Sequence, residues 1–386
     1  MKPKLVRITT VPESLKSLLS GQLKFMSDNG FDVIGISSNG KFLNDVKEEE
    51  GIEVFNIEMS RKITPIKDLI ALLYLYFYFK KCKPLIVHTH TPKAGTVGMI
   101  AAKLARVPVR LHTVAGLPLL EARGIKRVVL NIVEKITYSC STKVYPNSFS
   151  LKEIIEQNRF CNPKKMKVIA NGSSNGINTE YFNPALFSIE SRLELKNKLN
   201  INSQDFVFIF VGRLVRDKGI NELVKAFNDF NFDINSSKLL LVGHYESELD
   251  PLEKETLKII ENNSNIISVG FQKDVRIYFS IANCLVFPSY REGFPNVVMQ
   301  AGAMGLPSIV SDINGCNEII QEGVNGTIIP VKDKEVIVEK MRELTENRFF
   351  YNQLQINARN IIIERYEQKT VWESLLAEYR NLLKYN

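Results

Sequence analysis

The chain has 386 residues, of which 45% are hydrophobic and 24% charged, a composition typical of a soluble globular protein that is too long for a single core. Its five scattered cysteines and four histidines show no metal-ligand spacing, which excludes a recognisable zinc motif and fits a reducing cytoplasm. Lys and Arg outnumber Asp and Glu by 27 to 14 in residues 1–170 but are outnumbered by 23 to 28 in residues 171–386, so the first half has either an anionic partner or a solvated basic surface.

In the first half, short apolar and β-branched runs alternate with longer amphipathic segments. Near-continuous apolar strands separated by helices indicate a parallel sheet with helices on both faces. No signal-peptide core precedes the first run, so we expect the protein not to be exported. The expected strands cover residues 5–10, 31–37, 52–57, 85–90, 109–114, 143–147 and 167–170.

An uninterrupted apolar and aromatic run covers residues 69–79, with lysines on both sides. Such a run is too short to span a bilayer as a helix, which needs about 20 residues. We expect a helix packed on the sheet, because a strand follows directly. The alternative is a helix at a membrane surface, where tyrosines and lysines suit the interface.

Three histidines, His88, His90 and His112, lie at the ends of expected first-half strands. Ligands of open α/β sheets bind beyond the carboxyl ends of the strands. A histidine there could hydrogen-bond a sugar hydroxyl or steady a developing charge. The alternative is a half-buried histidine that is bonded to the backbone.

After a polar, Asn- and Ser-rich linker over residues 171–202, the alternating pattern begins again. The chain therefore predicts two doubly wound domains in tandem, with a cleft between their facing strand ends. The expected strands of this half cover residues 206–211, 239–242, 266–269, 285–287, 308–311 and 327–329, and a helix covers 220–227.

The loop over residues 212–219 follows the first strand of the second half. Arg213 at the strand end and Lys218 at the helix entry could converge on one anion. A planar guanidinium and a mobile ammonium are complementary for a diphosphate. The alternative is a basic surface loop without a ligand.

Residues 287–300 predict a strand, a loop and the start of a helix. The free N–H groups of Gly293, Phe294, Asn296 and Val297 would form a phosphate cradle at the helix N-terminus, with Asn296 as the N-cap. Glu292 beside it would accept hydrogen bonds from hydroxyls. The expected ligand is a phosphate attached to a group rich in hydroxyls, and the alternative is an ordinary turn with Glu292 in solvent.

Together these segments resemble the retaining glycosyltransferases of family 4, over essentially the whole chain. The resemblance implies the α/β GT-B fold, with two Rossmann-like doubly wound parallel-sheet domains that face each other across a cleft. It assigns residues 1–178 to acceptor binding and 179–365 to donor binding, with a C-terminal helix over 366–386 that packs back on the first domain. The segments that carry it are 212–214 with 218–219, 287–289 with 292–295, 171–177, and 90–95.

The resemblance also implies roles for the residues of the donor domain. Arg213 and Lys218 would hold the nucleotide diphosphate and stabilise it as it leaves. Glu292 would contact the hydroxyls of the transferred sugar, and the backbone amides that follow it would reach the phosphates. Gln300 departs from the pattern, because a second glutamate is expected there at the ribose hydroxyls; a glutamine can still pair with them but brings no negative charge.

A second departure concerns the histidine of the first domain. Many relatives carry it immediately before the glycine of the segment 111–116, where this chain has Ala115. The catalytic histidine is therefore either His112 or His90.

The implied activity is retaining transfer of a sugar from a nucleotide-sugar, with UDP favoured, by same-face attack and without a metal or other cofactor. The implied acceptor is a polyprenyl-diphosphate-linked saccharide of a capsule, O-antigen or similar glycan. The basic first domain would be drawn to the anionic inner face of the cell membrane, and we expect no nucleic-acid partner. The rivals are a sugar-nucleotide epimerase or hydrolase on the same fold, which needs carboxylates near Glu292, and a nucleic-acid-binding protein, which the pI of about 9.0 suggests.

Overall fold

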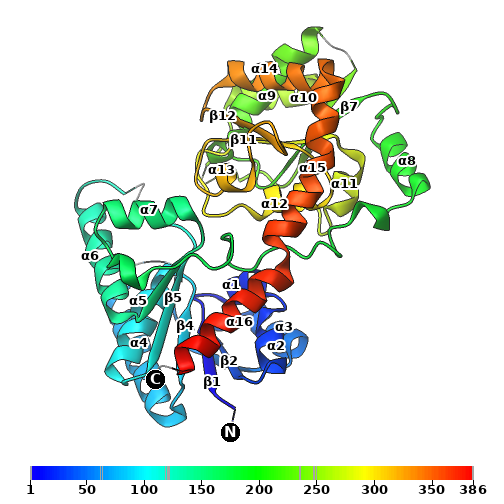
Figure 1. The fold of residues 1–386 in the computed structure, drawn as a ribbon. Coiled ribbons are helices and arrows are strands. Elements are labelled where there is room, and N and C mark those ends of the chain that lie inside the picture. The colour runs from blue at the N-terminus through cyan, green and yellow to red at the C-terminus, as the bar shows by residue number, and fades with distance from the viewer. Residues whose placement is uncertain are drawn as a thin grey trace. The chain divides into compact units, whose positions relative to one another are not determined.

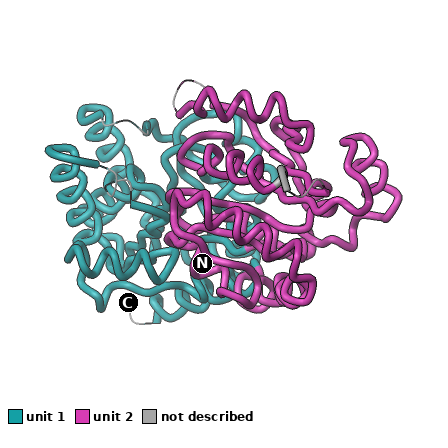
Figure 2. The backbone as a smooth tube through the Cα atoms, turned by 90° about the horizontal axis from the view of Figure 1, so that it is seen from above, with its two compact units in different colours: residues 1–176, 368–386 teal, residues 177–367 magenta. Residues whose placement is uncertain are grey.

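The computed structural model describes residues 2–60, 62, 64–117, 119, 122–233, 236–246, 248 and 250–384. The chain forms two compact units, one of residues 1–176 with 368–386 and one of residues 177–367 (Figures 1 and 2). Each unit contains one six-stranded sheet whose neighbouring strands are all parallel. The expected α/β class with two Rossmann-like domains is therefore confirmed. Residues 385 and 386 of the expected last helix lie outside the described residues.

The sheet of unit 1 has the strand order β3-β2-β1-β4-β5-β6. Its strands are β1 (Lys4–Ile8), β2 (Asp32–Ser37), β3 (Glu53–Asn56), β4 (Ile86–Thr89), β5 (Val109–Val114) and β6 (Lys143–Pro146). Its helices are α1 (Pro12–Leu19), α2 (Gln22–Asp28), α3 (Lys41–Glu50), α4 (Pro65–Cys82), α5 (Pro92–Leu104), α6 (Gly124–Cys140), α7 (Phe149–Gln157) and α16 (Gln368–Lys384), with a 3-10 turn at Pro163–Lys165.

Successive side chains of the central strands in unit 1 enter two different cores. Leu5 packs in a core with residues of α1, α2, α3 and α16, whereas Val6 packs in a core with residues of α4 and α5. The sheet therefore lies between two helical layers, and α4, α5 and α6 lie together on one side of it (Figure 1). This two-sided burial explains why its strands are apolar runs rather than alternating ones.

The last helix, α16, packs within unit 1. The indole Nε1 of Trp372 donates to Asn175 Oδ1 at 2.6 Å, and the Tyr379 hydroxyl lies 2.6 Å from His88 Nδ1. Both rings also pack on the N-terminal part of the chain, Trp372 on Phe25 and Tyr379 on Phe31.

The sheet of unit 2 has the order β12-β11-β10-β7-β8-β9, so β7 and β10 are neighbours. Its strands are β7 (Phe206–Val211), β8 (Ser237–Val242), β9 (Ile266–Ser268), β10 (Cys284–Phe287), β11 (Ser308–Ser311) and β12 (Gly326–Ile329). Its helices are α8 (Ile189–Lys198), α9 (Ile220–Asp233), α10 (Lys254–Asn262), α11 (Arg276–Ile281), α12 (Asn296–Ala303), α13 (Cys316–Ile319), α14 (Lys334–Glu346) and α15 (Arg348–Tyr366), with 3-10 turns at Pro184–Leu186 and Arg216–Lys218.

Two expectations about elements are wrong. The expected strand over residues 167–170 is not formed. The isolated bridge beside it joins Met166, the preceding residue, to Val144, and Ala170 adopts a left-handed φ of 48°, which no strand can include. The segment expected to be a polar linker contains α8, a polar helix without a fully buried residue, whose Ser188 N-cap accepts a hydrogen bond from the Ser191 N–H at 3.2 Å.

Candidate active site

The loops that follow β7 and β10 in unit 2 lie in direct contact. Parallel neighbours end at the same edge of a sheet, so both loops begin there. Gly219 has a φ of +70°, and a Cβ placed on it would lie 2.1 Å from the carbonyl oxygen of Pro288. The Tyr290 N–H donates to Asp217 O at 2.9 Å. Only glycine fits at position 219, and it allows the two loops to approach this closely.

This approach brings Lys218 and Glu292 together, although they lie far apart in the sequence. Their side chains form an ion pair and are only 19% and 16% exposed. The Ser289 hydroxyl also donates to Glu292 Oε1 at 3.0 Å, and Lys218 Nζ lies 5.5 Å from the centre of the Phe287 ring. The alternative of a solvated Glu292 in an ordinary turn therefore does not describe this loop.

Arg213 is held by a different carboxylate. It forms an ion pair with Glu246, which follows β8, and its side chain is 48% exposed. The loops after β7 and β8 touch at glycines, since a Cβ on Gly243 would lie 1.7 Å from Gly212 O. Arg213 and Lys218 thus share the same sheet edge but hold separate acids, and their joint action on one diphosphate stays a prediction. Sequence reasoning did not identify Glu246.

Helix α12 starts at the expected place, but its cap is not the expected one. Pro295 occupies the N-cap position and Asn296 is the first helical residue, without a side-chain capping bond, so the assignment of Asn296 as N-cap is wrong. Pro295 ends the loop with an extended backbone. Asn296 is exposed and Val297 is half-buried at the start of the helix. Gln300 is half-buried one turn further along.

The loop that precedes α12 is fixed by residues that the sequence did not single out. Asn314 Nδ2 donates to Gly293 O at 2.7 Å and to Glu292 O at 3.3 Å. A Cβ on Gly315 would lie 2.6 Å from the same Gly293 oxygen. The Phe294 ring packs edge-on against Tyr366 of α15, with ring centres 5.5 Å apart. The loop carbonyls are therefore bonded within the protein.

His90 of unit 1 borders a small buried cavity of about 20 Å³ beyond the end of β4. Arg7 Nε donates to His90 Nε2 at 3.0 Å, which places the proton of a neutral imidazole on Nδ1. Within the described residues His90 Nδ1 has no hydrogen-bond partner. His90 is thus a free donor at the expected edge of the sheet, and Thr113 and Asn147 line the same cavity.

Arg7 is a functional candidate that sequence reasoning missed. It is fully buried in β1, its Nη2 donates to Gln22 Oε1 at 2.5 Å, and burial lowers the pKa of its guanidinium. Gln22 in turn donates to Asn175 Oδ1 at 3.0 Å. The available signal was an arginine inside an otherwise apolar strand run, because an arginine is almost never fully buried without partners.

His112 lies elsewhere in unit 1. It is 3% exposed, its Nδ1 lies 2.8 Å from the Thr89 hydroxyl, and a Cβ on Gly95 of α5 would meet its ring at 2.3 Å. His88 is also buried and is bonded to two hydroxyls, those of Tyr379 and Thr113. The geometry favours His90, which directly follows β4, over His112. The expectation that His112 lies at a strand end is wrong, because it lies inside β5, where it is fully buried rather than half-buried.

These buried histidines predict that stability falls in acid. Burial lowers the pKa of His112 to about 4 and holds those of His88 and His90 well below 6.5. Between about pH 6.5 and pH 4 the unfolded chain binds these protons and the folded chain does not, so the free energy of unfolding decreases as the pH falls, by up to about 1.4 kcal/mol per pH unit for each histidine. Urea unfolding at pH 7, 6 and 5 measures this slope.

Two histidine variants test the source of the slope. His112→Asn should reduce it, whereas the exposed His244 of unit 2 gives a matched control in His244→Gln. An unchanged slope in His112→Asn would contradict the explanation.

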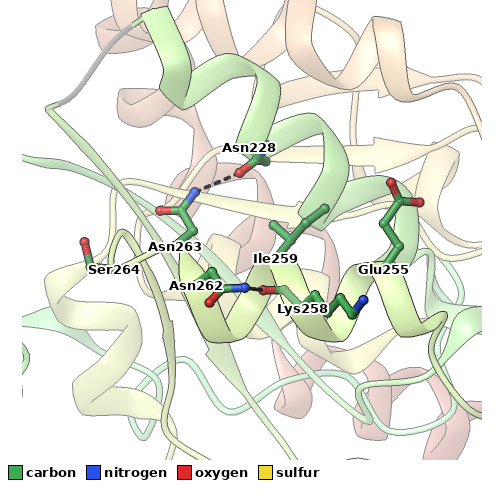
Figure 3. A pocket seen from close by; sticks show the side chains of 7 residues that line it. All are labelled: Asn228, Glu255, Lys258, Ile259, Asn262, Asn263 and Ser264. Carbon is green, nitrogen blue, oxygen red and sulfur yellow. Dashed lines mark hydrogen bonds between the residues drawn. The ribbon is translucent and has the colours of Figure 1, made fainter.

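A larger hollow of about 420 Å³ in unit 2 contains none of the expected site residues. It lies between α9 and α10 (Figure 3). Its amides are bonded locally, since Asn263 Nδ2 donates to Asn228 Oδ1 at 3.1 Å and Asn262 Nδ2 donates to Lys258 O at 2.9 Å. Because the hollow is open and lies away from the β7 and β10 loops, we do not assign the donor site to it.

Comparison with known proteins identifies the family. The model of the glycosyl transferase 4-like proteins matches residues 10–148, and that of the glycosyl transferases group 1 matches residues 191–361. The capsular polysaccharide biosynthesis glycosyltransferase CapM of Staphylococcus aureus is 33% identical over 381 residues, which cover 99% of this chain and 98% of that protein. The chain belongs to the group 1 glycosyltransferases. The predicted family and enzyme class are confirmed.

Further relatives agree with this assignment. An Escherichia coli protein, the UDP-Gal:alpha-D-GlcNAc-diphosphoundecaprenol alpha-1,3-galactosyltransferase, is 30% identical over 94% of each chain. Among solved structures, Anabaena Alr3699/HepE in complex with UDP has a TM-score of 0.82 at 18% identity and covers 99% of this chain and 100% of that one. A glycosyltransferase from Rickettsia africae ESF-5 has a TM-score of 0.81 at 20% identity, with full coverage of both chains. These likenesses confirm the GT-B fold of this glycosyltransferase.

Proposed function

We propose that this glycosyltransferase is retaining and metal-independent, and moves a sugar from a UDP-sugar to a polyprenyl-diphosphate-linked saccharide of a capsule, O-antigen or similar surface glycan. The names of three similar proteins support the proposed donor and acceptor classes. The Escherichia coli relative is named for UDP-Gal and a diphosphoundecaprenol acceptor, a Campylobacter jejuni relative for a diphospho-undecaprenol substrate, and CapM for capsular polysaccharide. We place the reaction at the cytoplasmic, inner face of the cell membrane, where such an acceptor would be reached.

The observation that carries the proposed binding of the sugar donor is the part-buried pair of Lys218 and Glu292, which lie in the loops after the neighbouring strands β7 and β10. Cleavage of the bond between the sugar and the diphosphate builds negative charge on the diphosphate. Lys218, Arg213 and the free N–H groups at the start of α12 would stabilise that charge without a metal. A cation held in a partly dry site acts more strongly than one in water.

Glu292 would bind the sugar rather than act as a nucleophile. Its Oε1 already accepts hydrogen bonds from Lys218 and Ser289, which fix the carboxylate and leave its other oxygen for sugar hydroxyls. Gln300 would pair with the ribose through its amide. In same-face attack the leaving phosphate takes the proton of the acceptor hydroxyl, so the retaining reaction needs no enzyme nucleophile. His90, held by Arg7, would donate Nδ1–H to a hydroxyl or developing charge in unit 1.

A thermal-shift panel tests the proposal. We expect UDP and UDP-sugars to raise the melting temperature more than GDP, ADP or their sugar conjugates, because a ligand that binds only the folded state stabilises it. The shift should persist in EDTA if the protein's own cations hold the diphosphate. NMR of the product formed from an α-linked UDP-sugar should show an α-linkage.

Other outcomes would overturn parts of this proposal. A shift that requires magnesium would remove the metal-independent part, and an inverted linkage would remove the retaining one. Free sugar, or an epimerised nucleotide-sugar, formed at the same rate with and without acceptor would favour the hydrolase or epimerase. A melting temperature that is raised by DNA or RNA but by none of the nucleotides would favour a nucleic-acid-binding protein.

A further inference from the structure

Helix α4 of unit 1 has two apolar sides, of which only one is packed. Its inner side places Ala71, Leu75 and Phe79 in the core beneath the sheet. Its outer side exposes a continuous stripe at helical spacing, with Ile66 78% and Phe77 65% exposed. The stripe, which we call the α4 stripe, consists of Ile66, Leu69, Ile70, Leu73, Tyr74 and Phe77. The helix is therefore packed on the sheet, as expected, and also presents an uncovered apolar surface.

Helix α6 repeats this arrangement in the same layer. It buries Thr137 and Tyr138 and exposes a second stripe, in which Ile125 is 85% exposed. The second stripe, which we call the α6 stripe, consists of Ile125, Val128, Val129, Ile132 and Ile136. Helix α5 packs against both α4 and α6, so the two stripes belong to one helical layer on one side of the sheet (Figure 1). Monomeric proteins rarely leave apolar stripes of this size open unless they bind something.

The charges of the layer show what kind of partner fits. Helices α4, α5 and α6 together carry eight Lys and Arg residues against two acids. Neither acid opposes an anionic partner, because Asp68 is paired with Lys93 and Glu134 is buried. Lys80 and Lys81 end α4, and both are exposed. The surface is thus apolar with a basic rim.

We propose that the α4 and α6 stripes dock unit 1 on the surface of a bilayer that contains anionic lipids. The apolar side chains enter the boundary between headgroups and acyl chains, and the lysines extend toward the headgroup phosphates. Exposed tyrosines such as Tyr74 suit that boundary. In the described part of the chain no helix is long and apolar enough to cross a membrane, so the contact lies in the interface plane. The proposal extends the proposed function by naming the surface that reaches the membrane.

A second copy of the chain fits this surface less well. A symmetric dimer would place the same patch on both sides of the contact, so the basic rim of one protomer would face the basic rim of its partner. The facing basic rims would repel each other, whereas anionic headgroups attract both lysines and arginines.

Vesicle sedimentation of the full chain tests the proposal. The wild type should pellet with phosphatidylcholine vesicles that contain about 30% phosphatidylglycerol, and much less with pure phosphatidylcholine. Leu73→Glu with Phe77→Glu should lower the partition coefficient at least about tenfold, because both side chains would leave the interface. Lys80→Glu with Lys81→Glu should lower it by roughly tenfold on anionic vesicles and remove the preference for them.

The matched control is Ile189→Glu with Leu193→Glu on α8 of unit 2, a second pair of exposed apolar residues four positions apart. It should pellet like the wild type. The proposal is overturned if the wild type does not bind anionic vesicles, if the α4 variant pellets as well as the control, or if light scattering shows a dimer that the α4 variant abolishes. Each protein is also tested for its UDP thermal shift, which reports on the proposed donor site in unit 2, so failure of the docking surface is distinguishable from failure of the proposed function.

Discussion

Replacement of Lys218 by alanine is expected to lower kcat by about 10²–10³-fold, the usual effect of losing one group that stabilises charge in a transition state. Lys218 is positioned for this by the turn at Gly219 and by its ion pair with Glu292. Steady-state rates with a UDP-sugar and acceptor measure the loss. KM should change less than kcat, because the charge on the diphosphate develops as the bond breaks.

The same variant leaves Glu292 without its cation in a part-buried loop, and the free energy of unfolding should fall by about 1–3 kcal/mol. The double variant Lys218→Ala with Glu292→Gln removes the unpaired charge, so its stability should recover while its turnover stays low. Lys225→Ala is the matched control, since Lys225 lies on α9 and forms an ion pair with Glu253 at the protein surface. A Lys218→Ala enzyme with wild-type kcat, or a double variant that recovers activity with stability, would show that the pair is only structural.

The fold could be predicted from the sequence because its strands are buried on both faces. Runs such as residues 206–211 are apolar at every position, and their alternation with helical pattern leaves few arrangements other than parallel sheets. The wrong strand over residues 167–170 shows the limit of this argument. A short apolar run is equally consistent with one bridge followed by a turn, and the left-handed φ of Ala170 depends on the surrounding packing.

The site could be predicted only in part. That Lys218 and Glu292 lie near the carboxyl ends of strands could be inferred, and the pairing of β7 with β10 brings them into contact. The partner of Arg213 could not be inferred, because Glu246 follows a third strand and its reach depends on the contact between Gly212 and Gly243. Nothing in the pattern of apolar residues indicates which side of a strand end a histidine faces.

His90 and His112 show this last point. His90 directly follows β4 and borders a small cavity, whereas His112 lies inside β5 and packs against α5. The difference comes from Arg7, whose buried guanidinium holds His90, and from Gly95, whose missing side chain leaves room for the His112 ring. Both causes are long-range contacts, which a single sequence does not display.

Gly219→Ala is expected to reduce activity by at least about 10²-fold, comparable to the loss of Lys218 itself. An alanine Cβ at this position would lie 2.1 Å from the Pro288 oxygen, a backbone atom that cannot rotate away. The loops after β7 and β10 must then separate, and Lys218 loses its position beside Glu292. Activity and urea unfolding of the purified variant measure the two consequences.

Gly323→Ala separates this clash from the cost of the backbone conformation. Gly323 has a φ of +72°, nearly that of Gly219, but a Cβ there would meet nothing within 4 Å. Both alanine variants are destabilised by about 1–2 kcal/mol because alanine disfavours the left-handed backbone conformation. A greater loss of stability in Gly219→Ala therefore measures the contact with Pro288. The prediction would be contradicted by equal losses of stability with activity retained in both variants. The loops after β7 and β10 could then move apart without cost, and their close approach would not be the reason that Lys218 lies beside Glu292.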